Sequence, residues 1–302
     1  MCGIISVKNL RDNRSVNGIV RILYQNQKER GQLGFGFVGL NARRIDTYRA
    51  THEKGILKYL DGNEYDEIIF HHRLPTSTEN TLKSTHPFIV DMDDKRYYFV
   101  HNGVIQNAHD LKEEHRKLGI KYTSEEDDCF NDSEALAWDF CLWLNHRQGK
   151  VKARGSVAFV CLEVDAKANR AGRLYFYRNS AARLKVYMDN SLLVIASQGN
   201  YAPVPENRLC FWDYRKRQIG KHRALDIPGP KLASFSGYGY DYFDGEMVDA
   251  YGISEIQTDI AALEQERDYL LSVGEFEKAE ALDEEIEALE DELKELRRMS
   301  TA

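Results

Sequence analysis

The second residue of the chain, Cys2, carries a thiol that could act as a nucleophile. Removal of Met1 would leave this thiol and a free α-amine on the same residue. An α-amine has a reference pKa of about 7.7 to 8.0 and a thiol one of about 8.5, so moving the proton from sulfur to nitrogen costs roughly 1 kcal/mol. Such an amine can serve as a general base. The alternative is that Cys2 is a small apolar residue that opens a buried strand.

A second candidate is the stretch from His101 to Ile105, in which an apolar strand runs into Asn102 and Gly103. Asn102 could supply a side-chain amide and Gly103 a backbone N–H to one oxyanion, because glycine lets the backbone approach a substrate closely. The alternative is a type I′ hairpin turn, for which Asn-Gly is the strongest short signal. Judged by these two residues alone, the turn is the favoured interpretation.

Two charged residues could hold a substrate by its own charges. Arg73 follows an apolar strand, and its planar guanidinium suits a carboxylate, although it could equally be a surface arginine beside a turn. Asp132 precedes a helical stretch and could pair with an ammonium group. The alternative there is a capping box made by Asn131 and Glu134, three residues apart.

These stretches, read together and in order, resemble the class II glutamine amidotransferases, whose glutaminase domain is an N-terminal nucleophile hydrolase. The nearest likeness is to the amidohydrolase half of glucosamine-6-phosphate synthase, and it covers roughly residues 2 to 200. The matching residues are Cys2-Gly3-Ile4-Ile5, Arg30-Gly31 with Gly34, His72-Arg73 with Thr76, His86-Pro87-Phe88, His101 to Ile105, Asp132-Ser133-Glu134, Gly155-Ser156, Arg178 and Ala196-Ser197. Their joint occurrence is specific where each single motif is not.

The resemblance implies that Cys2 attacks the side-chain amide of L-glutamine, releasing ammonia from a thioester that water then converts to glutamate. It also implies a role for each remaining candidate residue: Asn102 and Gly103 hold the oxyanion, Arg73 binds the α-carboxylate, Asp132 binds the α-ammonium, Thr76 and His86 complete the glutamine pocket, and Arg30 supports the nucleophile. The fold implied is an α+β, four-layer αββα sandwich.

Composition is that of a globular protein of roughly two domains, with 302 residues, 42% of them hydrophobic and 29% charged. No apolar run reaches 18 residues and no signal peptide is evident, so a cytoplasmic protein without membrane contact is expected. The five cysteines lack CxxC spacing, which argues against a disulfide framework or a zinc site. No basic cluster interleaved with aromatic residues suggests nucleic acid as a partner. We expect no cofactor.

Hydrophobic patterns place these residues on an α+β domain with largely antiparallel sheets. The expected strands are 3–7, 34–40, 67–71, 96–100, 157–164, 173–178, 183–188 and 192–197. The expected helices are 16–29, 108–118 and 133–144. A first domain over residues 1–230 is therefore expected, followed by a Gly- and Tyr-rich linker over residues 231–253.

Residues 254–299 have apolar side chains at alternating spacings of three and four, with Gly274 as a break. This pattern predicts an amphipathic helical hairpin or coiled coil. Residues 254–298 hold sixteen acidic and five basic side chains, which gives this segment a net charge of −11. Because the whole chain has a net charge of −7, residues 1–253 have a net charge of +4. The hairpin could pack on itself, join two copies of the chain or bind another protein.

About 100 residues follow Ser197, too few for the acceptor domain that is normally fused to such a glutaminase, so ammonia is expected to go to a separate partner enzyme. One alternative is a catalytically weak or inactive hydrolase-fold protein that acts as an interaction module through its hairpin. Another is a metal site built from His71, His72, His86 and His101. Because adjacent residues of a strand point to opposite faces, His71 and His72 should not converge on one metal, and we expect none.

Overall fold

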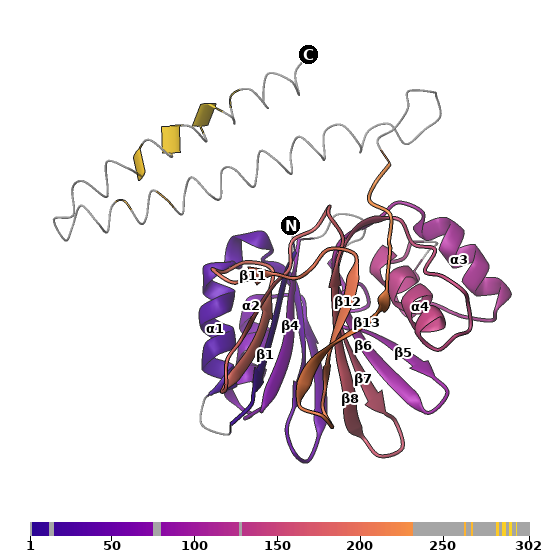
Figure 1. Cartoon of the computed structure of the whole chain (residues 1–302), viewed down its shortest axis with the longest axis horizontal. Helices are drawn as coiled ribbons and strands as arrows, with labels where there is room; N and C mark the ends of the chain where they lie inside the picture. Colours follow the sequence, from indigo (N-terminus) through magenta and orange to yellow (C-terminus); the bar gives the residue numbers. More distant parts are fainter. Residues whose placement is uncertain are drawn as a thin grey trace. The chain divides into compact units, whose positions relative to one another are not determined.

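The computed structural model describes residues 2–11, 15–74, 80–126 and 129–231, and beyond them only single positions between 263 and 294. The chain divides into two compact units, Met1–Pro230 and Lys231–Ala302 (Figure 1). The expected linker over 231–253 lies outside the described residues, and the domain bounds stay a prediction. Among the helices that the structure describes, none has the length and apolar content needed to cross a membrane.

The first sheet of the larger unit has seven strands, all paired antiparallel, in the order β11-β9-β10-β1-β4-β2-β3. Their bounds are β1 Gly3–Asn9, β2 Leu33–Leu40, β3 Ile45–Ala50, β4 Glu67–Arg73, β9 Lys185–Met188, β10 Leu192–Ala196 and β11 Ala202–Pro203. β1 lies between β10 and β4, so the residue next to Cys2 begins a central strand. Central strands are held from both sides, which gives the start of β1 a fixed position.

The second sheet has six antiparallel strands in the order β13-β12-β8-β7-β6-β5. Their bounds are β5 Phe88–Met92, β6 Lys95–Ile105, β7 Gly155–Asp165, β8 Arg170–Arg178, β12 Arg208–Asp213 and β13 Gln218–Ala224. β6 carries Asn102 and Gly103 as strand residues, paired with Ala158 and Val157 of β7. The hairpin turn favoured by Asn-Gly alone is therefore wrong, because the pairing of β6 with β7 continues through both residues.

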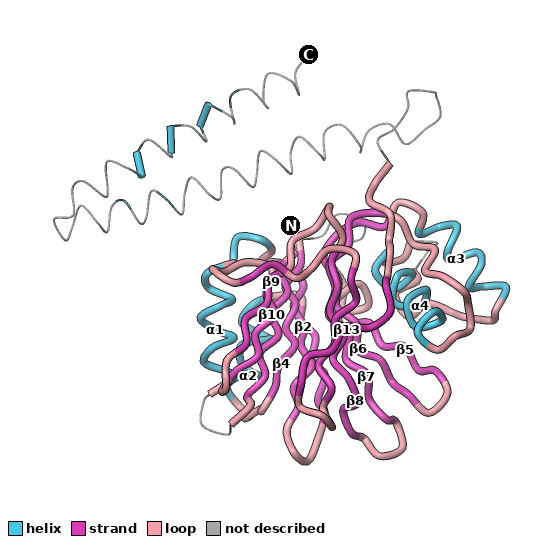
Figure 2. The backbone as a smooth tube through the Cα atoms, in the orientation of Figure 1, coloured by secondary structure: helices cyan, strands magenta, loops and turns pink. Residues whose placement is uncertain are grey.

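Two helices cover the outer face of each sheet, α1 and α2 on the first and α3 and α4 on the second (Figures 1 and 2). Their bounds are α1 Val16–Asn26, α2 Glu53–Asp61, α3 Ala108–Lys117 and α4 Asp132–Leu144, and a short 3₁₀ helix spans Lys28–Arg30. Ser15 caps α1 by accepting from the Gly18 N–H at 3.3 Å, and Asn131 caps α4 by accepting from the Ser133 N–H at 2.9 Å.

The expected capping box at the start of α4 is only half present. Asn131 caps the helix, but the Glu134 carboxylate does not return to it. Instead it accepts four hydrogen bonds from the backbone and hydroxyl groups of Thr123 and Ser124, at 2.6–2.9 Å. A buried carboxylate needs several donors, and the preceding loop supplies more of them than one helix end could.

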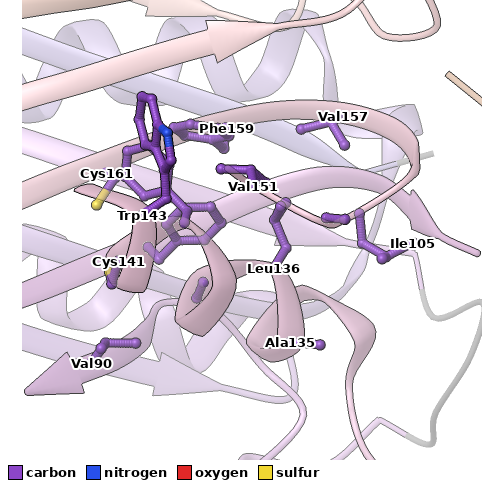
Figure 3. Packing of buried hydrophobic residues seen from close by; sticks show 14 of the residues in the cluster. Val90, Ile105, Ala135, Leu136, Cys141, Trp143, Val151, Val157, Phe159 and Cys161 are labelled. Atoms are coloured by element: carbon purple, nitrogen blue, oxygen red, sulfur yellow. The ribbon is translucent and has the colours of Figure 1, made fainter. Parts of the chain in front are cut away.

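Three buried apolar clusters fill the spaces between the four layers. One lies between the two sheets and includes Ile4, Ile69 and Val100, while the other two lie between each sheet and its helices. Figure 3 shows the outer cluster of the second sheet, where Leu136 and Cys141 of α4 lie near Phe159 and Cys161 of β7. Both faces of β1 are buried, which explains its continuous apolar sequence. The predicted four-layer αββα sandwich is confirmed.

At one end of the sandwich, a buried carboxylate links the two sheets. Glu67 at the start of β4 accepts from Lys8 Nζ at 3.0 Å, and the Tyr214 hydroxyl lies 2.7 Å from both of its oxygens. Tyr214 follows β12, so this contact ties the second sheet to the first. Alternation along β4 puts Glu67, Ile69, His71 and Arg73 on the same face, toward the second sheet.

The sequence patterns missed several elements of this fold. They are β3, α2, β5, β11, β12 and β13. α2 contains Gly55, which weakens a helical signal, and the last two strands extend the first unit beyond Ser197, where the patterns lose strength.

The predicted hairpin over 254–299 lies mostly outside the described residues. In the smaller unit, the described positions Arg267 and Asp283 are both helical, and Arg267 Nη1 lies 3.1 Å from Asp283 Oδ1. The hairpin itself stays a prediction.

Candidate active site

Five elements meet at the end of the sandwich opposite Glu67. Cys2 precedes β1, Arg73 ends β4, Asn102 lies on β6, Asp132 begins α4 and Ser197 follows β10. β1 and β4 are antiparallel, so the start of one lies beside the end of the other, with Gly3 opposite His72. Topology thus gathers residues that are far apart in the sequence.

Cys2 is held mainly through its backbone carbonyl. This oxygen accepts from Arg30 Nε at 3.0 Å and from Asn102 Nδ2 at 2.8 Å, while the thiol donates to the Leu74 carbonyl at 3.6 Å. Burial raises the pKa of the Cys2 thiol, and the positive charges of Arg73 and Arg30 lower it. A carbonyl can accept from a thiol but not from a thiolate, so the proton must leave this bond before sulfur can attack.

Asn102 is fixed by contacts at both ends of its amide. Nδ2 donates to the Cys2 carbonyl and, at 2.7 Å, to the Ser197 hydroxyl. Oδ1 lies 3.2 Å from Nε2 of His71, which is also 3.1 Å from the His101 carbonyl, so Nε2 must carry the hydrogen. This network shows which end of the Asn102 amide is the oxygen and which is the nitrogen.

Gly103 is at a position that only glycine suits. Its φ is +136°, and a Cβ there would lie 1.8 Å from the Ser156 carbonyl oxygen. Any side chain would push β6 away from β7 just beside Asn102.

Arg73 brings a positive charge close to the thiol, and Asp132 brings a negative charge close to Arg73. Arg73 is 3% exposed and donates to Ser84 Oγ at 3.0 Å; burial lowers its pKa, while the charges of Cys2 and Asp132 raise it. Asp132 Oδ2 accepts from the Ile105 N–H at 2.7 Å. Loss of water raises the pKa of the Asp132 carboxyl to about 6, against the lowering effect of backbone donors and Arg73. The site can therefore bind both charges of an amino acid.

The four histidines of the alternative metal site do not form one cluster. His71 faces the second sheet, and its ring lies 3.9 Å from that of His86, whereas His72 points outward against Tyr24 of α1. His101 faces α4, where Nδ1 accepts from the Ser133 hydroxyl at 2.9 Å. Among the residues that the structure describes, no group of three ligating side chains could hold a metal ion.

Burial keeps these imidazoles neutral. It lowers the pKa of His72 to about 3 and that of His101 to about 4, and it lowers the pKa values of His71 and His86 well below the ordinary range. Both ring nitrogens of His86 and Nδ1 of His71 are buried without a hydrogen-bond partner in the described part of the chain. Unpaired polar atoms next to a cluster of charges are typical of a functional site.

Thr76 lies outside the described residues, so its predicted place in the pocket stays a prediction. Sequence reasoning gave no role to Ser84 or Ser197, which contact Arg73 and Asn102. Ala196-Ser197 is among the stretches that carry the family resemblance, and its place directly after an apolar strand is a further signal that could have drawn attention to Ser197. A surface hollow of about 970 Å³ lies elsewhere, beside the start of α1, and none of the site residues lines it.

A family model described as class-II glutamine amidotransferases matches residues 29–209. The match includes Arg73, Asn102 and Asp132 and begins after Cys2. A curated relative, the isomerizing glutamine–fructose-6-phosphate aminotransferase of Sulfurisphaera tokodaii, is 28% identical over 130 residues, which are 42% of this chain and 22% of that protein.

Two solved structures share the fold. One is described as the allosteric regulatory enzyme of purine biosynthesis, with 18% identity, and the other as the glutamine phosphoribosylpyrophosphate amidotransferase from B. subtilis in complex with ADP and GMP, with 16% identity. Each gives a TM-score of 0.56 and covers 75% of this chain and 50% of its own. The chain thus spans about a fifth of the curated relative and half of each structure.

Proposed function

Because the chain belongs to the class-II glutamine amidotransferases, a family of enzymes, we propose that it hydrolyses the side-chain amide of L-glutamine through a thioester on Cys2. The observation that supports this proposal is the contact of Asn102 Nδ2 with the Cys2 carbonyl at 2.8 Å, together with the charge of Arg73 near the thiol and that of Asp132 near Arg73. This arrangement supports the proposed roles: an oxyanion donor, a nucleophile and two substrate anchors.

Substrate binding uses the two charges of free glutamine. The Arg73 guanidinium binds the α-carboxylate, and ionised Asp132 binds the α-ammonium. Thr76, His86 and Gly103 complete the pocket around the side chain. Holding both charged ends of the substrate orients its amide carbon toward Cys2 Sγ, which converts an encounter in solution into an intramolecular reaction.

The nucleophile forms when Met1 is removed. The new α-amine of Cys2 accepts the thiol proton, and the thiolate attacks the amide carbon of glutamine to form a C–S bond. The carbonyl electron pair moves to oxygen, giving a tetrahedral oxyanion that Asn102 Nδ2 and the Gly103 N–H stabilise. Arg30, which donates to the Cys2 carbonyl, keeps the nucleophile in place.

Collapse of the oxyanion breaks the C–N bond, and the amino group leaves as ammonia with the proton held by the α-ammonium of Cys2. The amine then takes a proton from water, and the hydroxide attacks the thioester. This second tetrahedral intermediate releases glutamate and regenerates the thiol. We propose that the ammonia then passes to an acceptor on a separate partner enzyme.

The test is mass spectrometry combined with activity-based labelling. We expect the intact mass to lack Met1 and a diazo-ketone analogue of glutamine to attach to Cys2 in equimolar amount. Cys2→Ala should abolish both labelling and glutamate release, whereas Cys129→Ala, at an exposed cysteine, should change neither. Retention of Met1, or full turnover by Cys2→Ala, would overturn the mechanism.

A further inference from the structure

Ser197 joins the two sheets beside the nucleophile. Its backbone N–H donates to the Ile4 carbonyl at 3.0 Å, and its hydroxyl oxygen accepts from the Ile4 N–H at 3.0 Å. The residue is 0% exposed, so both contacts are shielded from water. It is therefore locked to β1 two residues after Cys2, while its hydroxyl reaches across to Asn102 on β6.

Both amide hydrogens of Asn102 are already in use. An asparagine amide nitrogen has two hydrogens, and here one points to the Ser197 hydroxyl at 2.7 Å and the other to the Cys2 carbonyl at 2.8 Å. Neither is directed at a substrate. To stabilise an oxyanion, Asn102 has to exchange one of these two acceptors for the substrate oxygen.

The Cys2 contact is the one suited to exchange. The Cys2 carbonyl belongs to the residue that carries the attacking sulfur, so the hydrogen that points to it is the one nearer the reacting atoms. This carbonyl also accepts from Arg30 Nε at 3.0 Å and would keep that partner when Asn102 turns away. Losing one of two hydrogen bonds is much less costly than leaving a buried oxygen with none.

We infer that Ser197 is a positioning residue, whose hydroxyl anchors one amide hydrogen of Asn102 so that the other is delivered to the oxyanion. This inference rests on the proposed glutaminase function. His71 restrains the opposite end of the amide through Oδ1, so the side chain pivots between two fixed contacts. Without Ser197 the Asn102 amide can still donate hydrogen bonds, but its second hydrogen is no longer held toward the oxyanion.

Steady-state kinetics of the full chain with glutamine test the inference. Ser197→Ala should lower kcat by about 10- to 100-fold and leave KM within about twofold, because a misdirected donor weakens the transition state more than substrate binding. Ser6→Ala is the matched control: Ser6 is a buried serine on the same strand as Ile4, and its loss should leave kcat unchanged.

A double-mutant cycle separates positioning from a general structural role. If Ser197 acts through Asn102, Ser197→Ala should have no further effect on kcat when Asn102 is already alanine, whereas a structural role would lower kcat equally in both backgrounds. Equal effects in both backgrounds, or wild-type kcat for Ser197→Ala, overturn the inference.

A second variant covers a failure of Ser197→Ala to fold. Ser197→Cys keeps the volume of the side chain but replaces the hydroxyl oxygen with sulfur, a weak acceptor, so it should also lower kcat. Wild-type kcat in Ser197→Cys overturns the inference while the proposed function stands. Absence of both turnover and Cys2 labelling in the wild-type protein overturns the proposed function and, with it, the role of Ser197.

Discussion

The two ends of β4 show how differently one strand face can be used. At its start, the Glu67 carboxylate is matched by Lys8 and by the Tyr214 hydroxyl. Six residues later, about 20 Å along the strand, Arg73 lies near buried histidine nitrogens of His71 and His86 that have no partner in the described structure. The Glu67 carboxylate thus has its partners within the protein, whereas these histidine nitrogens have none among the described residues.

This difference suggests that the Glu67 end of β4 serves the stability of the fold and the Cys2 end serves function. A buried polar group with its partners in place contributes to a unique fold, whereas one without them is destabilising until a ligand pairs with it. The Glu67 end links the two sheets, so it can hold the sandwich together while the Cys2 end keeps unpaired groups. Changes at the two ends should therefore affect different measurements.

The largest effect is expected at the Cys2 end. Asn102→Ala should lower kcat by about 10²- to 10³-fold, the usual consequence of losing one oxyanion donor. KM should change little, which steady-state kinetics will show. A rise in KM with kcat intact would instead make Asn102 part of the substrate pocket and break the contrast between the two ends.

The opposite pattern is expected at the Glu67 end. Glu67→Gln keeps the shape of the side chain but weakens its bonds to Lys8 and Tyr214, and it should lower the free energy of unfolding by about 1–3 kcal/mol. Urea denaturation measures this loss. Tyr214→Phe, which removes only the hydroxyl, is the milder companion variant. For both variants kcat should match the wild type, and a large loss of kcat would show that the ends are coupled.

A smaller effect is expected from pH. The pKa of Asp132 is raised to about 6, and only the ionised carboxylate attracts an ammonium group. Above pH 6 Asp132 is charged and glutamine binds; as pH falls from 6 to 5 it takes up a proton, and the Kd of glutamine should rise by about fivefold. Calorimetry on Cys2→Ala measures binding without turnover. Adding Asp132→Asn should give weak binding that no longer varies over this range.

The smallest effect is expected from the smaller unit. Both ends of β4, and every described site residue, belong to the unit Met1–Pro230. Deleting residues 254–302 should leave basal glutamine hydrolysis within about twofold of the wild type, because changes away from a site usually have little effect on it. Only assembly should change, which light scattering measures. An insoluble truncated protein would show that the segment completes the fold.

Much of this architecture could be predicted from local patterns. The apolar runs that became β1, β4 and β7 were predicted to within two residues at each end, whereas β6 continues five residues beyond its predicted end at residue 100; helical spacing predicted α1 and α4. β5 was not predicted because it is short and ends beside acidic residues, and α2 was not predicted because Gly55 interrupts its helical pattern. Element boundaries depend on pairing partners, which a local pattern does not contain.

The sequence by itself determined the chemistry that is available: a thiol at position 2, a guanidinium and a carboxylate for the two charges of an amino acid, and the periodicity of the strands and helices that bear them. Only the tertiary structure decided which groups meet. It kept Asn102 and Gly103 within a strand, sent His71 and His72 to opposite faces, and brought Asn102 against residues 100 and 95 positions away. A side chain's type is local information, but its partner depends on how distant strands pair and pack.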